Sequence, residues 1–425
     1  MANLNSKKTI WIIVVIYCIL NVFFNNYYLQ TKIPSYGGIA ILFFSILLIT
    51  NFKRIIKNLG GNNITSIVSK LLMMFIFSIL WVFILWGQLP WSSMIVMGSL
   101  GGVFPLVVYF VLQKYKISTQ TLVKAITIIY ILYVICYLIG LYTIPTPLFG
   151  YTEKSSSIEE IADSIAQRGV IRLGVPGADF VVLIIFLILT RYKNKKIFYL
   201  LLIPVSITLL MRGTRTPFFA TIIIAFIYYL WQIKHKWIII FTGVIIYIFS
   251  GSIYQKMLNS DSDNAVIKYV QMTSNQIERS NEKEEDIRIE MTKYMFTEFN
   301  EGNIMRIIFG NGVPGYSGHY AKVIEKLGND RSYYPVDTAF TTIFVYFGII
   351  GLILYLQLLW IVIKTKVSPE GTFSKLYIYY LYLISPTNCS LIFSAGLTLG
   401  LALYIIQQNQ IKKTFYLKKS KYISL

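Results

Sequence analysis

The sequence predicts an all-α protein: a polytopic membrane helix bundle of about twelve transmembrane helices with two large outer loops. Three observations support this fold class. The chain of 425 residues is 56% hydrophobic, with a mean hydropathy of +0.61, which is too apolar for one soluble core. Apolar runs of about 15 to 22 residues recur along the chain, and about 20 residues span a bilayer. The charged residues between these runs also separate by sign.

The acidic residues are concentrated in two segments. Of 19 Asp and Glu, 13 lie between Lys256 and Asp337, five lie between Glu153 and Asp179, and the last is Glu370. The short connections between other apolar runs carry lysine and arginine. Short basic loops stay in the cytoplasm, so both acidic segments are predicted to face outward and both termini inward. The net charge of +20 occurs in clusters between apolar runs, which disfavours nucleic-acid binding.

The apolar runs define the individual spans. They lie at about 10–29, 36–52, 67–86, 92–113, 122–142, 178–190, 197–211, 217–233, 237–254, 339–363, 376–388 and 390–408. The last pair is separated by Ser385-Pro386-Thr387-Asn388, which suits either a tight hairpin or a kink in one long helix. We favour the hairpin, because a single helix would place the lysine-rich tail outside. Residues 1–425 then form one membrane domain, with outer loops at 143–177 and 255–338.

Each outer loop contains one predicted helix. In the first loop, residues 155–166 form a short helix with a serine at its start and acidic residues in its first turn. In the second loop, residues 286–299 place four apolar side chains on one helical face, namely Ile287, Met291, Tyr294 and Met295. We expect this helix to lie along the membrane surface or to pack on the bundle, and to end at Asn300-Glu301-Gly302.

Arg212 and Arg215 are exceptions to the pattern that basic residues lie in the inner connections, because they lie at the outer end of two short spans. The preceding span rises about 22 Å over its length, whereas a bilayer core is about 30 Å thick, so both arginines should lie below the outer interface. Cations at that depth usually serve a site. Two guanidinium groups beside the helix N-terminus that Pro217 begins would suit a phosphate or pyrophosphate. The alternative is contact with lipid headgroups.

Three further arginines are candidates. Arg168 and Arg172 approach the outer interface before the sixth span, where headgroup contact or pairing with nearby acidic residues explains them nearly as well. Arg172 is favoured, because it lies closer to the span. Arg288 lies on the predicted helix of the second outer loop, where most charges are simply solvated.

His319 and Asp337 are the candidate general bases. His319 follows a glycine-rich stretch of the second outer loop, and a histidine pKa lies near neutrality. An ordinary surface histidine is the alternative. Asp337 lies where the chain re-enters the membrane, so it could cap the next helix or act as a second acid or base. No His/Cys cluster has metal-ligand spacing, so neither a metal nor another cofactor is predicted.

Three stretches together carry a family resemblance. They are Met211-Arg212-Gly213-Thr214-Arg215-Thr216, the segment from Arg288 to Gly318 with Ile308-Phe309-Gly310-Asn311-Gly312, and Asp337-Thr338-Ala339-Phe340 followed by Tyr346-Phe347-Gly348-Ile349-Ile350-Gly351-Leu352. With the predicted topology, they resemble the O-antigen polymerase and O-antigen ligase superfamily of bacterial inner-membrane proteins. That family often carries a His-Asn pair where this chain reads Val336-Asp337. Whether His319 or Asp337 is the functional counterpart therefore stays open.

The resemblance implies metal-independent glycosyl transfer on the outer face of the cytoplasmic membrane, with sugars linked to undecaprenyl pyrophosphate. It implies that the pyrophosphate is held by the arginines Arg172, Arg215, Arg212, Arg288 and Arg168. His319 would then deprotonate the acceptor hydroxyl, with Asp337 as the alternate base. Tyr316, Tyr320, Tyr333 and Tyr334 could stack on sugar rings. Implied partners are the lipid-linked oligosaccharides, the bilayer, a chain-length regulator and a flippase.

Within this superfamily, we favour the polymerase that joins lipid-linked repeat units into a surface polysaccharide. The nearest alternative is the O-antigen ligase, which transfers the glycan to lipid A core. A polysaccharide flippase or other transporter is an alternative from a different class. Transporters usually carry charge near the membrane midplane and often show repeated halves, whereas here the charge gathers in outer loops and no halves repeat.

Overall fold

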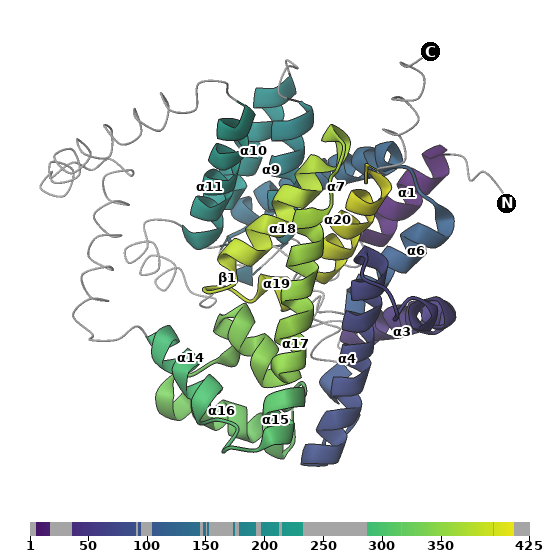
Figure 1. Ribbon diagram of the computed structural model, residues 1–425. Coiled ribbons are helices and arrows are strands. Elements are labelled where there is room, and N and C mark those ends of the chain that lie inside the picture. Colours follow the sequence, from purple (N-terminus) through teal and green to yellow (C-terminus); the bar gives the residue numbers. More distant parts are fainter. Residues whose placement is uncertain are drawn as a thin grey trace, which may run out of the picture.

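The protein is a helical bundle with one short strand pair in the residues that its computed structural model describes (Figure 1). These residues are 6–17, 36–90, 92–94, 104–144, 148–149, 151–152, 173–174, 178–192, 197–211, 215–232, 287–315, 317–393 and 395–411. The first helices are α1 (Ser6–Tyr17), α3 (Tyr36–Lys57), α4 (Ile64–Trp86), η2 (Phe104–Val107), α6 (Val108–Tyr115) and α7 (Thr119–Tyr142). Two strands of two residues, β1 (Tyr151–Thr152) and β2 (Leu173–Gly174), form one antiparallel pair.

Further helices follow among the described residues from 178 onward. They are α9 (Ala178–Arg191), α10 (Ile197–Met211), α11 (Arg215–Gln232), α14 (Ile287–Thr297), α15 (Ile304–Phe309), α16 (His319–Arg331), η3 (Pro335–Asp337), α17 (Ala339–Lys364), η4 (Pro369–Gly371), α18 (Thr372–Ile384), α19 (Ser390–Phe393) and α20 (Gly396–Gln408). The predicted helix at 155–166 and the predicted span at 237–254 lie outside the described residues.

Among the residues that the structure describes, three helices are long and apolar enough to cross a membrane, namely α4, α7 and α17. Shorter apolar helices occupy Phe180–Arg191, Phe198–Leu209, Thr216–Gln232 and Gly396–Gln408. They coincide with predicted spans, because each apolar run ends at polar or basic residues. The all-α membrane class is therefore confirmed, whereas the total of about twelve spans stays a prediction.

The last two predicted spans form a hairpin. The α18 and α20 helices pack against each other, and an antiparallel bridge joins Val367, before α18, to Gln410, after α20. Next to this bridge, Ser368 N donates to the Asn409 carbonyl oxygen at 2.9 Å. The chain reverses after Ile384 and then forms the short helix α19. The start of α18 and the end of α20 therefore lie at one end of the bundle, here called the lysine end, which includes Lys364.

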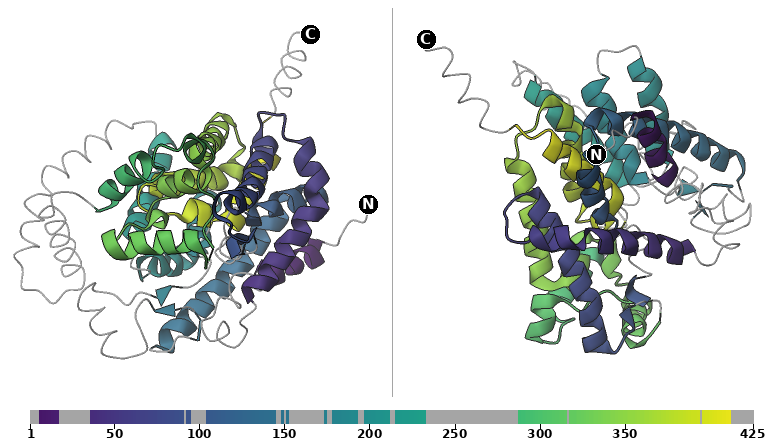
Figure 2. Two further views of the ribbon diagram at one scale, coloured as in Figure 1. Left: turned by 90° about the horizontal axis from the view of Figure 1, so that it is seen from below. Right: turned by 90° about the vertical axis from the view of Figure 1, so that its right-hand side faces the viewer.

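Helix α17 begins at the opposite end of the bundle. There, Ala339 N donates to the Ser385 carbonyl oxygen at 2.8 Å, so the start of α17 meets the end of α18. Helices α14, α15 and η3 contact α17 at this end, and with α16 they form a cap of short helices (Figures 1 and 2). We call it the cap end. Topology predicts that it faces outward.

The predicted amphipathic helix of the second outer loop is confirmed as α14. Met291 and Met295 are buried, and the ring of Phe296 stacks on that of Phe344 in α17, with centroids 4.3 Å apart. Helix α14 ends at Thr297, three residues before the predicted stop at Asn300-Glu301-Gly302, where Glu301 and Gly302 have positive φ of 49° and 69°. The apolar face therefore packs on the bundle, although Ile287 at its start is exposed.

Helix α17 is broken at Gly348, and the loop after α15 fills the break. Gly348 has φ 64° and ψ −161°, which a helix cannot accommodate. The Asn311 and Gly312 amides donate to the carbonyl oxygens of Val345 and Tyr346 at 2.7 and 3.1 Å. In a membrane, such freed carbonyls must find protein partners. Two of the stretches behind the family resemblance are therefore complementary parts of one structural joint.

A closed set of hydrogen bonds joins α4, α6 and α20. The Thr65 hydroxyl lies 2.7 Å from the Tyr109 hydroxyl, and Gln407 Nε2 donates to the Thr65 hydroxyl at 2.9 Å. The Tyr109 hydroxyl in turn donates to Gln407 Oε1. Each of these polar groups is thus satisfied by another helix.

Tyr109→Phe should therefore destabilise the bundle, because it removes the hydroxyl that completes this set. Hydrogen bonds between membrane helices contribute about 0.6 to 1.7 kcal/mol, so we expect a small fall in the Tm of the detergent-solubilised protein. Tyr142→Phe is the control, since Tyr142 is an exposed residue at the end of α7. Equal Tm values for the two variants would contradict the prediction.

Candidate functional site

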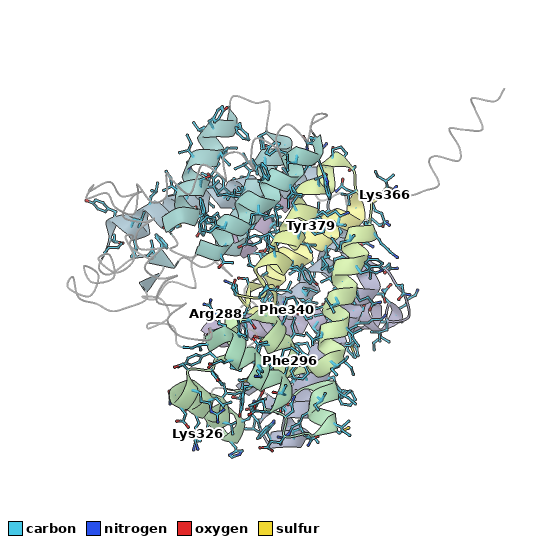
Figure 3. All side chains as sticks on the ribbon, turned by 60° about the vertical axis from the view of Figure 1, so that its left-hand side comes forward. Arg288, Phe296, Lys326, Phe340, Lys366 and Tyr379 are labelled. Atoms are coloured by element: carbon cyan, nitrogen blue, oxygen red, sulfur yellow. The ribbon has the colours of Figure 1, made fainter. Side chains whose placement is uncertain are left out.

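Arg288 and Asp337 lie together at the cap end. Arg288 is an exposed residue in the first turn of α14, and Asp337 is a half-buried residue that ends η3, against which α14 packs. Burial raises the pKa of the Asp337 carboxyl, and the nearby Arg288 charge opposes that rise. Figure 3 labels Arg288 and Phe340, which lie on the adjoining elements α14 and α17. A carboxyl group and a guanidinium group therefore lie on packed elements where α17 begins.

Threonines fix the segment that carries Asp337. The N-cap of α17 is Thr338, whose hydroxyl accepts from the Thr341 amide at 3.3 Å. The Thr342 hydroxyl donates to the Pro335 carbonyl oxygen at 2.6 Å, which ties η3 to the first turn of α17. Capping by Asp337, the simpler of the two sequence interpretations, is therefore wrong: the neighbouring threonine has the extended backbone and the reach that a cap needs. The Asp337 carboxyl remains available for another role.

The chain path brings the main chain of Arg215 to the same end. Arg191 at the end of α9 lies 3.5 Å from Glu370 in η4, so α9 ends at the lysine end. Helix α10 then returns toward the cap end, and α11 begins there with Arg215 and packs along α18 (Figure 1). The structure describes the backbone of Arg215 and not its side chain. The predicted site residues Arg168, Arg172 and Arg212 lie outside the described residues.

His319 lies at the far end of α16 from this pair. It is the exposed first residue of α16, and its ring centroid is 5.8 Å from that of Trp86 at the end of α4. Arg331, the last residue of α16, stacks over the Tyr294 ring of α14 at 4.8 Å. Thirteen helical residues place the two ends about 18 Å apart. The structure therefore brings together Arg288 and Asp337 but leaves His319 at a distance from both.

The candidate sugar-stacking tyrosines have different surroundings. Tyr320 is fully buried and stacks on Trp86, so its ring cannot receive a sugar. Tyr333 and Tyr334 precede η3 beside Asp337, and the Tyr333 hydroxyl lies 3.4 Å from Glu290 of α14. Tyr316 lies outside the described residues.

Sequence reasoning missed two residues at the cap end of the bundle, Arg306 of α15 and Trp86 of α4. The Arg306 guanidinium lies 4.7 Å from the centroid of the Trp86 ring. The available signals were a cation inside an apolar segment, Ile304–Phe309, and a tryptophan at the last position of a predicted span. Neither signal shows that the two residues meet, because they are far apart in sequence.

These features define a class of protein. Membrane-length helices form the bundle, and short helices at one end hold a carboxylate beside a guanidinium. The protein is thus a multi-pass membrane protein with a candidate site at one end of its bundle.

Part of the chain is similar to a known protein family. Residues 198–356 match the family model described as O-antigen ligase. This segment includes Arg215, Arg288, His319 and Asp337, together with both parts of the broken-helix joint. The resemblance to the O-antigen polymerase and ligase superfamily is therefore confirmed for this part of the chain. No curated protein matches the chain.

Proposed function

We propose that the protein polymerises undecaprenyl-pyrophosphate-linked oligosaccharide repeat units into a surface polysaccharide, on the outer face of the cytoplasmic membrane. One observation supports the proposal: Asp337 in η3 and Arg288 in the first turn of α14 lie on elements that pack against each other, within the segment that matches the O-antigen ligase family. The transfer needs a base for an acceptor hydroxyl and cations for a pyrophosphate leaving group. Both residue types meet at the end of the bundle that is predicted to face outward.

The reaction follows from these two groups. The acceptor hydroxyl oxygen attacks the anomeric carbon of the donor sugar, while the bond between that carbon and the pyrophosphate oxygen breaks. The leaving pyrophosphate keeps the electron pair, and the Asp337 carboxylate receives the hydroxyl proton. Because burial raises the pKa of Asp337, its carboxylate is a stronger base than an exposed one.

The arginines hold the pyrophosphate in this proposal. The structure describes the side chain of Arg288, and Arg215 is the first residue of α11 at the same end of the bundle. The N-terminus of α11 adds partial positive charge, which favours a phosphate oxygen there. Arg172, Arg212 and Arg168 complete the set that the sequence predicted. Together they stabilise the charge that develops on the leaving group.

Asp337 is preferred to His319 as the base because of its position. The carboxylate lies within the electrostatic reach of Arg288, whereas His319 lies at the other end of α16. A base must come within hydrogen-bond reach of the hydroxyl that attacks beside the pyrophosphate.

The proposal is tested with purified protein in liposomes that contain undecaprenyl-pyrophosphate-linked repeat units and, in a second sample, lipid A core as acceptor. Longer lipid-linked chains without lipid A core would support the polymerase. Glycan transfer to lipid A core alone would support the ligase, the activity named in the description of the matched family. Translocation of unchanged lipid-linked substrate would support a transporter and would contradict both activities.

The pH dependence of the rate tests the pairing of Arg288 with Asp337. The base must be ionised, so activity falls as pH drops through its pKa. Since the Arg288 charge lowers that pKa, Arg288→Gln should raise it and move the acid limb of the profile to higher pH. The measurement is the initial elongation rate across a pH series. Lys293→Gln, which removes an exposed charge from the same helix, should leave the limb in place; an unmoved limb in Arg288→Gln would contradict the pairing.

A further inference from the structure

A second polar cluster lies at the His319 end of α16, formed by side chains from three helices. Trp86 ends α4, Arg306 lies on α15, and His319 and Tyr320 begin α16. The Trp86 and Tyr320 rings stack with centroids 4.7 Å apart and an interplanar angle of 11°. The Arg306 guanidinium lies over the Trp86 ring, also at 4.7 Å. These contacts hold the cation in one place, because an aromatic face attracts and orients a guanidinium.

Three buried donors of this cluster have no acceptor. Trp86 Nε1, Arg306 Nε and the Tyr320 hydroxyl are buried and hydrogen-bond to no residue that the structure describes. The Tyr320 side chain is fully buried, and burial raises the pKa of its hydroxyl, which therefore stays protonated. Native proteins rarely leave buried donors unpaired, because each costs about 1 to 3 kcal/mol. The three donors belong to side chains that touch one another, so this cluster has unmet hydrogen-bonding capacity at one place in the fold.

The charges around the cluster favour an anionic acceptor. Arg306 pairs with Glu301 at 3.8 Å, but Glu301 is 83% exposed, so this ion pair neutralises little of the charge. Helix α16 begins at His319 without a side-chain cap, since Gly318 precedes it, and its first turn contains no acidic residue. The N-terminus of a 13-residue helix adds partial positive charge at this point.

We propose that this cluster binds a phosphate group. Arg306 supplies the charge, and Trp86 Nε1 and the Tyr320 hydroxyl supply neutral donors to the phosphate oxygens. The same chemistry is offered by a membrane phospholipid headgroup and by a free phosphate. Exposed apolar side chains adjoin the cluster in sequence, namely Leu89 after Trp86 and Ile304 and Met305 before Arg306. This second site lies at the other end of α16 from Asp337 and does not depend on the proposed transferase activity.

Binding to the full-length purified protein tests the proposal. One arm titrates inorganic phosphate, and the other presents phosphatidylglycerol in mixed micelles against micelles of an uncharged lipid at equal ionic strength. Binding is measured by calorimetry and by the rise in Tm. We expect one or both phosphate-bearing probes to bind, and Arg306→Gln to weaken binding by about tenfold or more, since hydrogen bonds to charged groups are the strong ones. Inorganic phosphate binding alone identifies a free anion as the source, and binding of phosphatidylglycerol alone identifies a lipid.

The chain offers a matched control. Arg331→Gln also removes a guanidinium that stacks on an aromatic ring of the cap, at 4.8 Å over Tyr294, and it should bind the probes as the wild type does. Tyr320→Phe keeps the stacked ring and removes one donor, so it should weaken binding even if Arg306→Gln fails to fold. Wild-type protein that binds neither probe, or variants at Arg306 and Tyr320 that bind as tightly as Arg331→Gln, would overturn the proposal.

Discussion

Gly348→Ala is expected to abolish the folded protein. Gly348 has φ 64° and ψ −161°, a backbone conformation that is open almost only to glycine. A β-carbon there would also overlap the main-chain carbonyl of Ile308, which cannot rotate away as a side chain can. The collision would push the loop from the break in α17 and leave the Val345 and Tyr346 carbonyls without their amide partners. Backbone strain of about 1 to 3 kcal/mol and the loss of these buried hydrogen bonds would both lower the stability of the fold.

The measurement is the yield of monodisperse protein in detergent, followed by its Tm. Gly87→Ala is the matched control, because Gly87 has a similar φ of 62° but open space around its missing β-carbon. That variant should lose only the cost of a left-handed alanine, about 1 to 2 kcal/mol. Gly310→Ala, on the loop side of the joint, should resemble Gly348→Ala, since its β-carbon would overlap the Tyr346 backbone. If Gly348→Ala and Gly87→Ala were equally stable, the joint would not be essential to the fold.

The spans could be predicted from sequence because each one depends on a local property. The predicted apolar runs agree closely with the observed bounds of α4, α7, α10 and α17, because each run is long enough and ends at glycine, a polar residue or a basic residue. The predicted helix at 286–299 was found for the same reason, since Met291 and Met295 recur at helical spacing and are buried. Local spacing says nothing, however, about which segments meet.

The break at Gly348 could not be predicted for this reason. Its apolar run continues without interruption, and the loop that fills it ends α15, a six-residue helix too short to show periodicity. The motif Ile308-Phe309-Gly310-Asn311-Gly312 was recognisable as a family feature, but its structural purpose depends on a partner in another helix. The same limit applies to Arg306, whose stacking on Trp86 joins two distant parts of the sequence.

The choice between His319 and Asp337 shows what the structure adds to the site. The sequence places both residues in one outer loop and leaves their separation open. Helix α16 lies between them and holds His319 beside Trp86, while the threonines at the start of α17 hold η3 against α14. The arginines Arg168, Arg172 and Arg212 stay predictions, and their part in the site rests on the sequence.

Asp337→Asn should reduce elongation of lipid-linked repeat units by about 10²- to 10⁴-fold, the usual contribution of a positioned general base. The amide keeps the size of the side chain but cannot receive the acceptor proton. The fold should survive. Because the folded-state pKa of Asp337 lies above the ordinary carboxyl value, its ionisation costs stability as the pH rises from the ordinary pKa to the raised one, and the full penalty persists at higher pH; a neutral asparagine removes this penalty. We therefore expect a Tm at neutral pH at least equal to that of the wild type.

The two readouts separate catalysis from folding. Asp330→Asn, which replaces an exposed carboxylate at the end of α16, is the control and should elongate chains at the wild-type rate. Loss of elongation in Asp337→Asn together with a retained Tm assigns the missing step to proton transfer. Wild-type chain lengths from Asp337→Asn, combined with their loss in His319→Gln, would instead move the reaction to the Trp86 end of α16. The pyrophosphate would then have to lie with Arg306, because a base acts only within hydrogen-bond reach of the attacking hydroxyl.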